Sequence, residues 1–421
     1  MYSEIGLKDG YLTINRESGT DTAFTIFLCL TWSNIIMTCF KGVLRHIIGN
    51  ESIINMGITI FIIAMILISI PIFVSSIKKG AYLIYLAFVL IWIISGVLHP
   101  ATQQWVFDIN NIYSVLIKIV PFFFIGLVLN EKYIYKMYII SIVSIYFYFI
   151  YAFVFHRLTV GNGTVSDMYA AYSLLVHVSL VFAYNFKNPS VFGVITVVAG
   201  LVVQIGLGTR GAVGCFIALF IFLFLYGGKF TIRQKIVAFA IIIPIAFLVY
   251  KNIDVIMDSL SSLLDSMGMS TRIVDSFKSS DITDDNGRNN IAEFFREKVK
   301  DNPNGYGIGY DRMFDFTPYA HNFRMELLVS FGVVFGNAAF LIFTGLFVIS
   351  MLIEKRRENA LLMAVLFFGV GYMQLIVSNS YLREPGFWLL LGLSVSTITF
   401  NLENKRIMKQ FKLSDFRQDY E

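Results

Sequence analysis

Charged residues and cysteines are both scarce in this chain of 421 residues. Charged side chains make up 14% of the sequence, whereas about 25% is usual for a soluble globular protein. Hydrophobic residues account for 57%, and the mean hydropathy is +0.70. The three cysteines, Cys29, Cys39 and Cys215, lie in apolar runs and indicate neither a disulfide framework nor a zinc site. The composition therefore indicates an integral membrane protein.

Motifs of soluble nucleotide-dependent and metal-dependent enzymes are absent as well. The sequence contains no G-x-x-x-x-G-K-[ST] loop, so it carries no ATP-driven motor, and neither H-E-x-x-H nor G-x-S-x-G occurs. Residues 206–211 spell the dinucleotide pattern G-x-G-x-x-G, but that pattern needs a strand–turn–helix context and an acidic residue about 20 positions later. Here both flanks are apolar and the next acidic residue is Asp254. We expect neither a cofactor nor a metal. The net charge of +5 does not indicate a nucleic-acid partner, and we expect none.

Long apolar runs dominate the rest of the chain. A bilayer core of about 30 Å requires about 20 apolar residues per helix. Twelve segments qualify, of which the eighth, ninth and twelfth are short: 22–40, 53–74, 81–98, 112–129, 133–155, 168–185, 190–207, 212–226, 236–250, 325–352, 360–377 and 387–400. We predict an all-α fold, a single polytopic membrane domain over residues 1–421 with about twelve transmembrane helices and one large extracytoplasmic loop.

The distribution of lysine and arginine predicts the orientation, because short cytoplasmic loops are enriched in both. With the N-terminus inside, the inside loops hold the basic clusters at 78–79, 132–136, 187, 229–235, 355–357 and 405–417. The short outside connections hold only Lys41, Arg45, Arg157, Arg210 and Arg383. We therefore expect a multi-pass protein of the bacterial cytoplasmic (inner) membrane, with both termini cytoplasmic and the loop 251–324 outside.

The loop 251–324 is polar but patterned. Apolar residues recur at helical spacing over 253–267, which predicts an amphipathic helix at the membrane surface. N-capping residues at 284–286 predict a second helix from Arg288 to about residue 300, ending before Pro303. The glycines at 305, 307 and 309 predict a turn-rich segment whose backbone can approach a ligand closely. We expect the loop to act as a lid within the membrane domain.

Three side chains are the main candidates for chemistry, and each has a structural alternative. Arg210, flanked by glycines between two apolar runs, is either a snorkelling interfacial arginine or a bidentate phosphate ligand. Arg288 is either solvated at a helix start or paired with an anion, since a cation there opposes the helix dipole. His321 is either a hydrogen-bonded interfacial histidine or a group that transfers protons near neutral pH.

Four further polar residues accompany these three in the sequence. Asn322 and Arg324 follow His321 directly, and Tyr310 ends the glycine-rich turn. Glu326 lies at the start of an apolar span, where an ionisable group is costly and is usually functional or paired. We include all four as weaker site candidates, and we note that Glu326 also suits the N-terminal end of a helix.

The order of these elements resembles the O-antigen ligase/Wzy polymerase superfamily. The resemblance rests on Gly208-Thr-Arg-Gly-Ala212 opening a span, then Arg288, Asn302-Pro-x-Gly-x-Gly, His321-Asn322 and a Glu-Leu-Leu-Val-x-x-Gly-x-x-x-Gly span at 326–336. Members of that superfamily are membrane glycosyltransferases of the GT-C type with about a dozen helices and one large outer loop. They act on undecaprenyl-diphosphate-linked glycans, which in a polymerase serve as both donor and acceptor.

The resemblance also implies roles for individual residues. Arg210 and Arg288 match arginines that bind the lipid diphosphate, and His321 matches the histidine that activates the acceptor hydroxyl. Many members carry a tryptophan a few residues after the loop arginine, where this chain has Phe294 and Phe295. The implied enzyme is a metal-independent repeat-unit polymerase of O-antigen or capsule synthesis. Its partners would be membrane lipids, a chain-length regulator and a flippase.

Other functions fit parts of the same pattern. A ligase that transfers the finished polymer to lipid A–core shares every motif with a polymerase. A polysaccharide flippase or transporter would keep its polar residues along a cavity near the membrane midplane. A receptor or structural membrane protein would leave the two arginines and the histidine replaceable. The concentration of polar residues at the outer mouth favours a glycosyltransferase over a flippase or transporter. Of the two glycosyltransferases, which share this pattern, we predict the polymerase.

Overall fold

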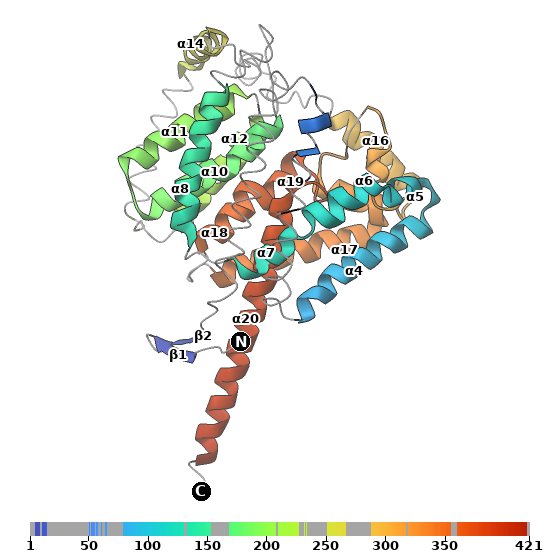
Figure 1. Cartoon of the computed structure of the whole chain (residues 1–421), viewed down its shortest axis with the longest axis vertical. Helices are drawn as coiled ribbons and strands as arrows, with labels where there is room; N and C mark the ends of the chain where they lie inside the picture. The colour runs from blue at the N-terminus through green and yellow to red at the C-terminus, as the bar shows by residue number, and fades with distance from the viewer. Residues whose placement is uncertain are drawn as a thin grey trace.

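The computed structural model of the chain describes residues 5–8, 11–14, 79–129, 133–152, 168–207, 209–226, 251–266, 288–316, 319–354 and 360–418, with scattered positions between 50 and 64 and at 231 and 233. The described part is helical apart from one hairpin (Figure 1). Its helices are α4 (Lys79–Leu98), α5 (Pro100–Phe107), α6 (Ile109–Ile112), η2 (Tyr113–Ile119), α7 (Phe122–Val128), α8 (Ile134–Ile150), α10 (Met168–Lys187), α11 (Val191–Gly206), α12 (Arg210–Tyr226), α14 (Ile253–Ser266), α16 (Arg288–Asp301), η5 (Tyr310–Arg312), α17 (Phe323–Glu354), α18 (Ala360–Ala364), η6 (Val365–Gly371), α19 (Met373–Ser378) and α20 (Pro385–Gln418).

Most of the described apolar segments form helices close to their predicted bounds, although α20 runs to Gln418, well beyond the predicted end at residue 400. Within the described residues, three helical stretches are long and apolar enough to cross a membrane: 109–128, 323–353 and 360–378. Four shorter apolar helices cover 82–98, 134–150, 191–206 and 210–226. The predicted spans 22–40 and 236–250, and most of 53–74, lie outside the described residues. These helices agree with a membrane protein.

The hairpin is the one departure from the predicted all-α fold. Strands β1 (Ile5–Lys8) and β2 (Tyr11–Ile14) pair antiparallel, with Ile5 opposite Ile14. Leu7, Leu12 and Ile14 alternate with more polar residues, and this period of two is typical of a strand. This hairpin was not predicted from the sequence.

Helix α20 is the axis of the packing, and α7 crosses it closely. A Cβ atom added at Gly126 of α7 would lie 3.0 Å from the Cα atom of Gly392 in α20. Small residues at such a crossing let two membrane helices approach each other. A second group of helices, α8, α10, α11 and α12, packs around buried residues of α10 such as Leu174 and Val178.

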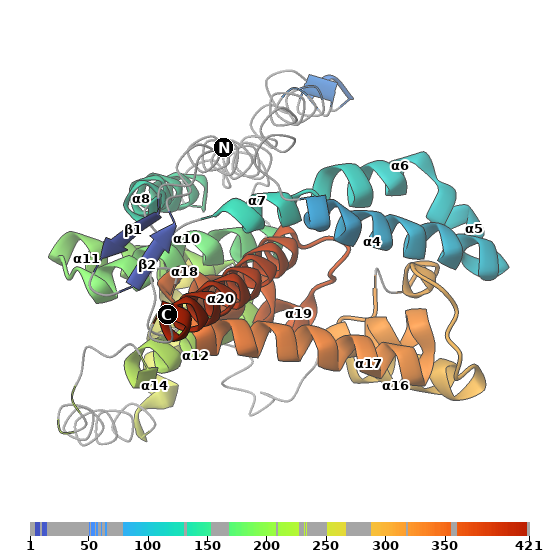
Figure 2. The same ribbon diagram turned by 90° about the horizontal axis from the view of Figure 1, so that it is seen from below.

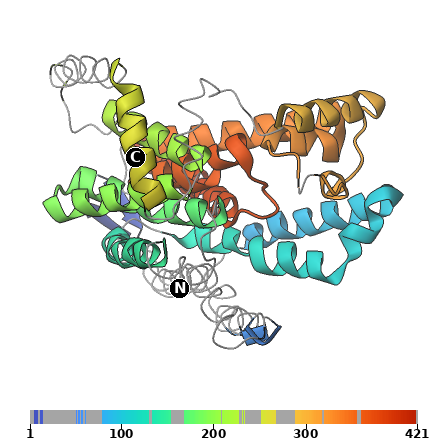
Figure 3. The ribbon, with the colours of Figure 1, turned by 90° about the horizontal axis from the view of Figure 1, so that it is seen from above.

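The long loop contributes two helices at one end of the molecule. Helices α14 and α16 have almost the predicted bounds, and both lie far from the C-terminal end of α20 (Figure 1). Seen from above, α14 lies over the α11–α12 region, where Met257 and Leu260 pack against the second group of helices (Figure 3). Helix α16 packs on α17 through Phe295 and Val299. The predicted helices of the loop are thus confirmed.

Two pairs of elements form arms on one side of the molecule. Figure 2 shows α4 and α5 along one arm and α16 with the first part of α17 along the other. The glycine-rich segment 302–310 lies between them, since Ile308 is fully buried and its N–H donates to Ser95 Oγ of α4 over 2.7 Å. This segment leads directly into the candidate site.

Candidate functional site

Helix α17 is broken at Gly332, and the glycine-rich segment occupies the break. Gly332 has φ 76° and ψ −178°, a combination essentially restricted to glycine. In an unbroken helix the carbonyls of Val329 and Ser330 would accept from N–H groups four residues later. Here they accept instead from Tyr306 N at 2.8 Å and Gly307 N at 3.0 Å. The loop thereby replaces the missing turn of the helix.

The glycines of this segment bring its backbone close to protein. A Cβ at Gly307 would meet His99 and Thr102, and a Cβ at Gly309 would overlap the ring of Trp105. Both glycines have positive φ, at 96° and 84°. The expected close approach therefore exists, but its partner is α5 and not a ligand.

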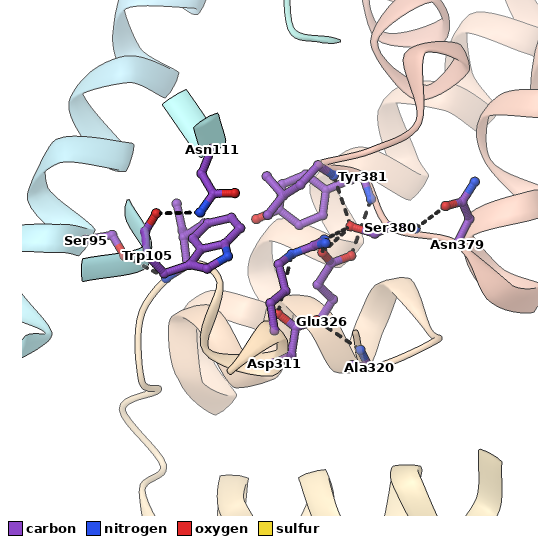
Figure 4. Close-up of polar contacts among 12 residues, drawn as sticks. Ser95, Trp105, Asn111, Asp311, Ala320, Glu326, Asn379, Ser380 and Tyr381 are labelled. Atoms are coloured by element: carbon purple, nitrogen blue, oxygen red, sulfur yellow. Dashed lines mark hydrogen bonds and ion pairs between the residues drawn. The ribbon is translucent and has the colours of Figure 1, made fainter. Parts of the chain in front are cut away.

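A buried ion pair follows the glycine-rich segment. The Nη2 atom of Arg312 lies 3.0 Å from Glu326 Oε1, and the two side chains are 4% and 1% exposed. Arg312 also donates to the hydroxyl of Ser380, which itself donates to Glu326 Oε1 over 2.5 Å. The N–H of Tyr381 donates to Glu326 Oε2 over 3.3 Å (Figure 4). This Arg312 cluster ties the loop and α17 to the connection between α19 and α20.

Asp311 extends the Arg312 cluster toward His321. Its Oδ2 atom accepts from the N–H of Ala320 over 2.9 Å, and its Oδ1 atom lies 4.0 Å from Arg312 Nε. Burial raises the pKa of Asp311, and the charge of Arg312 counteracts part of that rise. Because Ala320 directly precedes His321, this carboxyl group fixes the backbone that carries the histidine.

His321 and Tyr319 are both attached to the C-terminal end of α19. His321 has φ 54°, the only positive φ of a non-glycine residue within the described part of the chain. Its Nδ1 atom lies 3.3 Å from Ser378 Oγ, and its ring centre lies 4.1 Å from that of Tyr319. The Tyr319 hydroxyl donates to the carbonyl oxygen of Ser378 over 3.2 Å. A strained, doubly anchored histidine is typical of a position held for function.

Arg210 begins α12, which meets the same end of α19. A Cβ at the next residue, Gly211, would lie 2.8 Å from Val377 Cγ1 and would overlap the hydroxyl of Tyr172. Val377 directly precedes Ser378, the partner of His321. The absence of a side chain at Gly211 therefore lets the start of α12 approach the segment that anchors His321. Two predicted site residues, 111 positions apart in the sequence, are thus brought to one region.

Two charged residues of the α19–α20 connection belong to this region and were not predicted. Arg383 is exposed, and its Cζ atom lies 5.9 Å from the Tyr319 ring centre. Glu384 is buried; its carboxylate accepts from Asn379 Nδ2 over 2.7 Å and from Gly386 N over 2.9 Å. Burial raises the pKa of Glu384 to about 7. The signal in the sequence was an Arg-Glu pair between two apolar runs, of which only Arg383 was considered, as a guide to orientation.

Three of the other predicted residues have structural roles here. Asn322 caps α17, where its Oδ1 atom accepts from Met325 N over 3.2 Å, and its Nδ2 atom donates to the Ile376 carbonyl. Arg324 is exposed and donates from Nε to Asn337 Oδ1 over 3.0 Å, beyond the break in the same helix. Tyr310 stacks on Tyr306 with ring centres 4.1 Å apart.

For Arg288 the structure describes the backbone alone. It is the first residue of α16, as predicted, but its side chain lies outside the described atoms. Among the described residues, no three His, Cys, Asp or Glu side chains form a metal-ligating group. The region can therefore offer guanidinium groups, one imidazole and several hydroxyls, a set suited to binding an anion and moving a proton.

Comparisons with known proteins add no relative. No protein-family model matches the sequence, and no curated protein matches it.

Proposed function

We propose that the chain is a membrane glycosyltransferase of the O-antigen ligase/Wzy polymerase type. It polymerises undecaprenyl-diphosphate-linked repeat units into O-antigen or capsular polysaccharide at the outer face of the cytoplasmic membrane. The observation that carries the proposal is the approach of α12, which begins at Arg210, to the end of α19 that anchors His321. The proposed family places an arginine and a histidine from the same two positions in one site.

The chemistry fits these groups. The bond between the anomeric carbon of the donor sugar and its diphosphate oxygen breaks, and the acceptor hydroxyl oxygen forms the new bond to that carbon. His321 takes the hydroxyl proton, and the negative charge remains on the departing lipid diphosphate. Arg210, together with Arg288 from the loop, stabilises that charge as it develops. A lipid-linked donor needs no nucleotide at this face of the membrane.

The proposed topology has about twelve spans with both termini in the cytoplasm. Helices α14 and α16 lie at the end of the molecule opposite the C-terminal end of α20, which supports an outer loop and an inner C-terminus (Figure 1). A transporter would need its arginines along a midplane cavity. Arg210 instead lies at the start of α12 and Arg383 in the connection between α19 and α20, so the polymerase is favoured over a flippase.

The test is the surface glycan of the native host, separated on a gel. His321→Asn is the most informative variant, because asparagine tolerates the left-handed backbone that position 321 requires. With this variant or Arg210→Ala, a polymerase leaves a single capped repeat unit. The matched control Arg296→Ala removes an exposed arginine of α16 and keeps the normal ladder.

Two other gel patterns would overturn the proposal in different ways. Polymer that accumulates on the lipid carrier, with none on the surface, would identify a ligase. A normal ladder from both site variants, each present at wild-type level in the membrane, would remove His321 and Arg210 from the site.

A further inference from the structure

Arg383 differs from its neighbour Arg312 in how its charge is compensated. Arg312 is buried and pairs with Glu326, with Asp311 close by. Arg383 is exposed, and its guanidinium forms no hydrogen bond or ion pair within the described part of the chain. The charges of Asp311 and Glu326 act on Arg383, but neither carboxylate pairs with it directly. An exposed guanidinium with no direct partner, beside the Tyr319 ring that packs on His321, has the chemistry of an anion ligand.

The position of Arg383 is fixed from several sides. Its backbone N–H donates to the Ser380 carbonyl over 3.0 Å, and the Ser380 side chain is held in the Arg312 cluster. The Tyr319 ring has Arg383 Cζ at 5.9 Å and Arg312 Cζ at 6.0 Å. The same ring lies 4.1 Å from that of His321. Arg383 therefore lies over the Tyr319 ring, and the same ring packs against His321.

The guanidinium groups of Arg312 and Arg383 both lie near the Tyr319 ring, and their like charges repel each other. Burial of part of the side chain, together with the charge of Arg312, lowers the pKa of Arg383. Asp311 and Glu326 offset part of this lowering, and a bound anion beside Arg383 would relieve the remaining repulsion. A phosphoryl group matches the planar guanidinium best, since it accepts two parallel hydrogen bonds.

We propose that Arg383 is a further phosphate-binding residue of the site and takes the diphosphate of the lipid-linked donor. Arg312 acts as a positioning residue, because it holds in place the α19–α20 connection that carries Arg383. This inference rests on the proposed function. It adds Arg383, from the connection between α19 and α20, to the proposed phosphate-binding residues Arg210 of α12 and Arg288 of the long loop.

The experiment titrates undecaprenyl diphosphate against the purified full-length protein in detergent micelles. Loss of one charge-assisted contact should weaken binding by about tenfold or more in Arg383→Ala. Arg383→Lys should lie between wild type and alanine, because lysine keeps the charge but not the bidentate geometry. The control Arg296→Ala should bind like wild type.

Parallel titrations with phosphatidylglycerol separate a specific ligand from a general headgroup site. A larger loss for undecaprenyl diphosphate than for phosphatidylglycerol supports the proposal, and an equal loss for both overturns it. Wild-type affinity for undecaprenyl diphosphate in Arg383→Ala also overturns it. If the wild type itself binds undecaprenyl diphosphate no better than phosphatidylglycerol, the proposed function fails together with this inference. A thermal unfolding curve equal to that of the wild type shows that each variant is folded.

Discussion

Arg312 and Glu326 form a buried ion pair that joins the end of the long loop to the start of α17, with 3.0 Å between Nη2 and Oε1. Removal of one partner leaves an uncompensated buried charge. We expect Arg312→Ala or Glu326→Gln to destabilise the protein by about 3–5 kcal/mol. The joint replacement Arg312→Met with Glu326→Leu should cost less than either single change. Unfolding in mixed micelles, followed by circular dichroism, measures all three; a double variant that loses the sum of both single effects would contradict the pairing.

Gly332 allows the glycine-rich segment to enter α17. Alanine at this position is strained at φ 76°, and its Cβ would collide with the carbonyl oxygen of Pro303 and with Asn304. Gly332→Ala should therefore destabilise the protein by about 3 kcal/mol. Gly345 provides the control in the same helix, because a Cβ there has nothing within 4 Å. Gly345→Ala should leave stability unchanged or raise it by up to about 1 kcal/mol. Equal effects of the two changes would mean that α17 is not broken at Gly332.

Glu384 should make stability depend on pH. Its pKa is raised from 4.5 to about 7 in the folded protein, so the folded state binds the proton more tightly than the unfolded state does. Stability from this group is therefore fully present below about pH 4.5 and is lost as the pH rises through about 7. Glu384→Gln removes the titration. The melting temperature of Glu384→Gln, relative to wild type, should be higher at pH 8 than at pH 5, and a pH-independent difference would refute this assignment.

Gly211 tests the approach of α12 to α19. A methyl group at this position would press on Val377, and overpacking of this kind costs about 1–3 kcal/mol. Gly211→Ala should lower the rate of repeat-unit transfer at least tenfold, because it moves Arg210 away from the end of α19 that anchors His321. Gly214, one turn further along α12, has nothing within 4 Å of a Cβ. Gly214→Ala should keep the wild-type rate; loss of activity in both variants would point to the helix as a whole.

Sequence reasoning located most helices, because their signals are local. Apolar runs of membrane length and the amphipathic pattern of α14 and α16 both depend on residues close together in the chain. The choice of His321 as a candidate also rested on a local signal, its polar neighbours in the sequence. The break in α17 did not, since a lone glycine in an apolar run is ordinary in membrane helices.

The partners within the site could not be read from the sequence. Arg312 and Glu326 are 14 positions apart, but Ser380 is 54 beyond Glu326 and joins them only because α20 returns to α17. The glycines at 307 and 309 were taken to face a ligand, and the side chains they meet belong to α5. Arg383 looked like one basic residue of a short loop. Its relation to Tyr319 appears only when the α19–α20 connection folds onto the long loop.

A reconstitution experiment can show whether this chain joins lipid-linked repeat units through His321. Purified protein in lipid vesicles is supplied with undecaprenyl-diphosphate-linked repeat units, and the length of the lipid-linked glycan is followed by mass spectrometry. We expect the wild type and Arg296→Ala to lengthen the glycan by whole repeat units, while His321→Asn leaves the single unit unchanged. Wild-type protein that produces no lengthened glycan would refute the proposed polymerase, and His321→Asn that lengthens it at the wild-type rate would refute the role of His321.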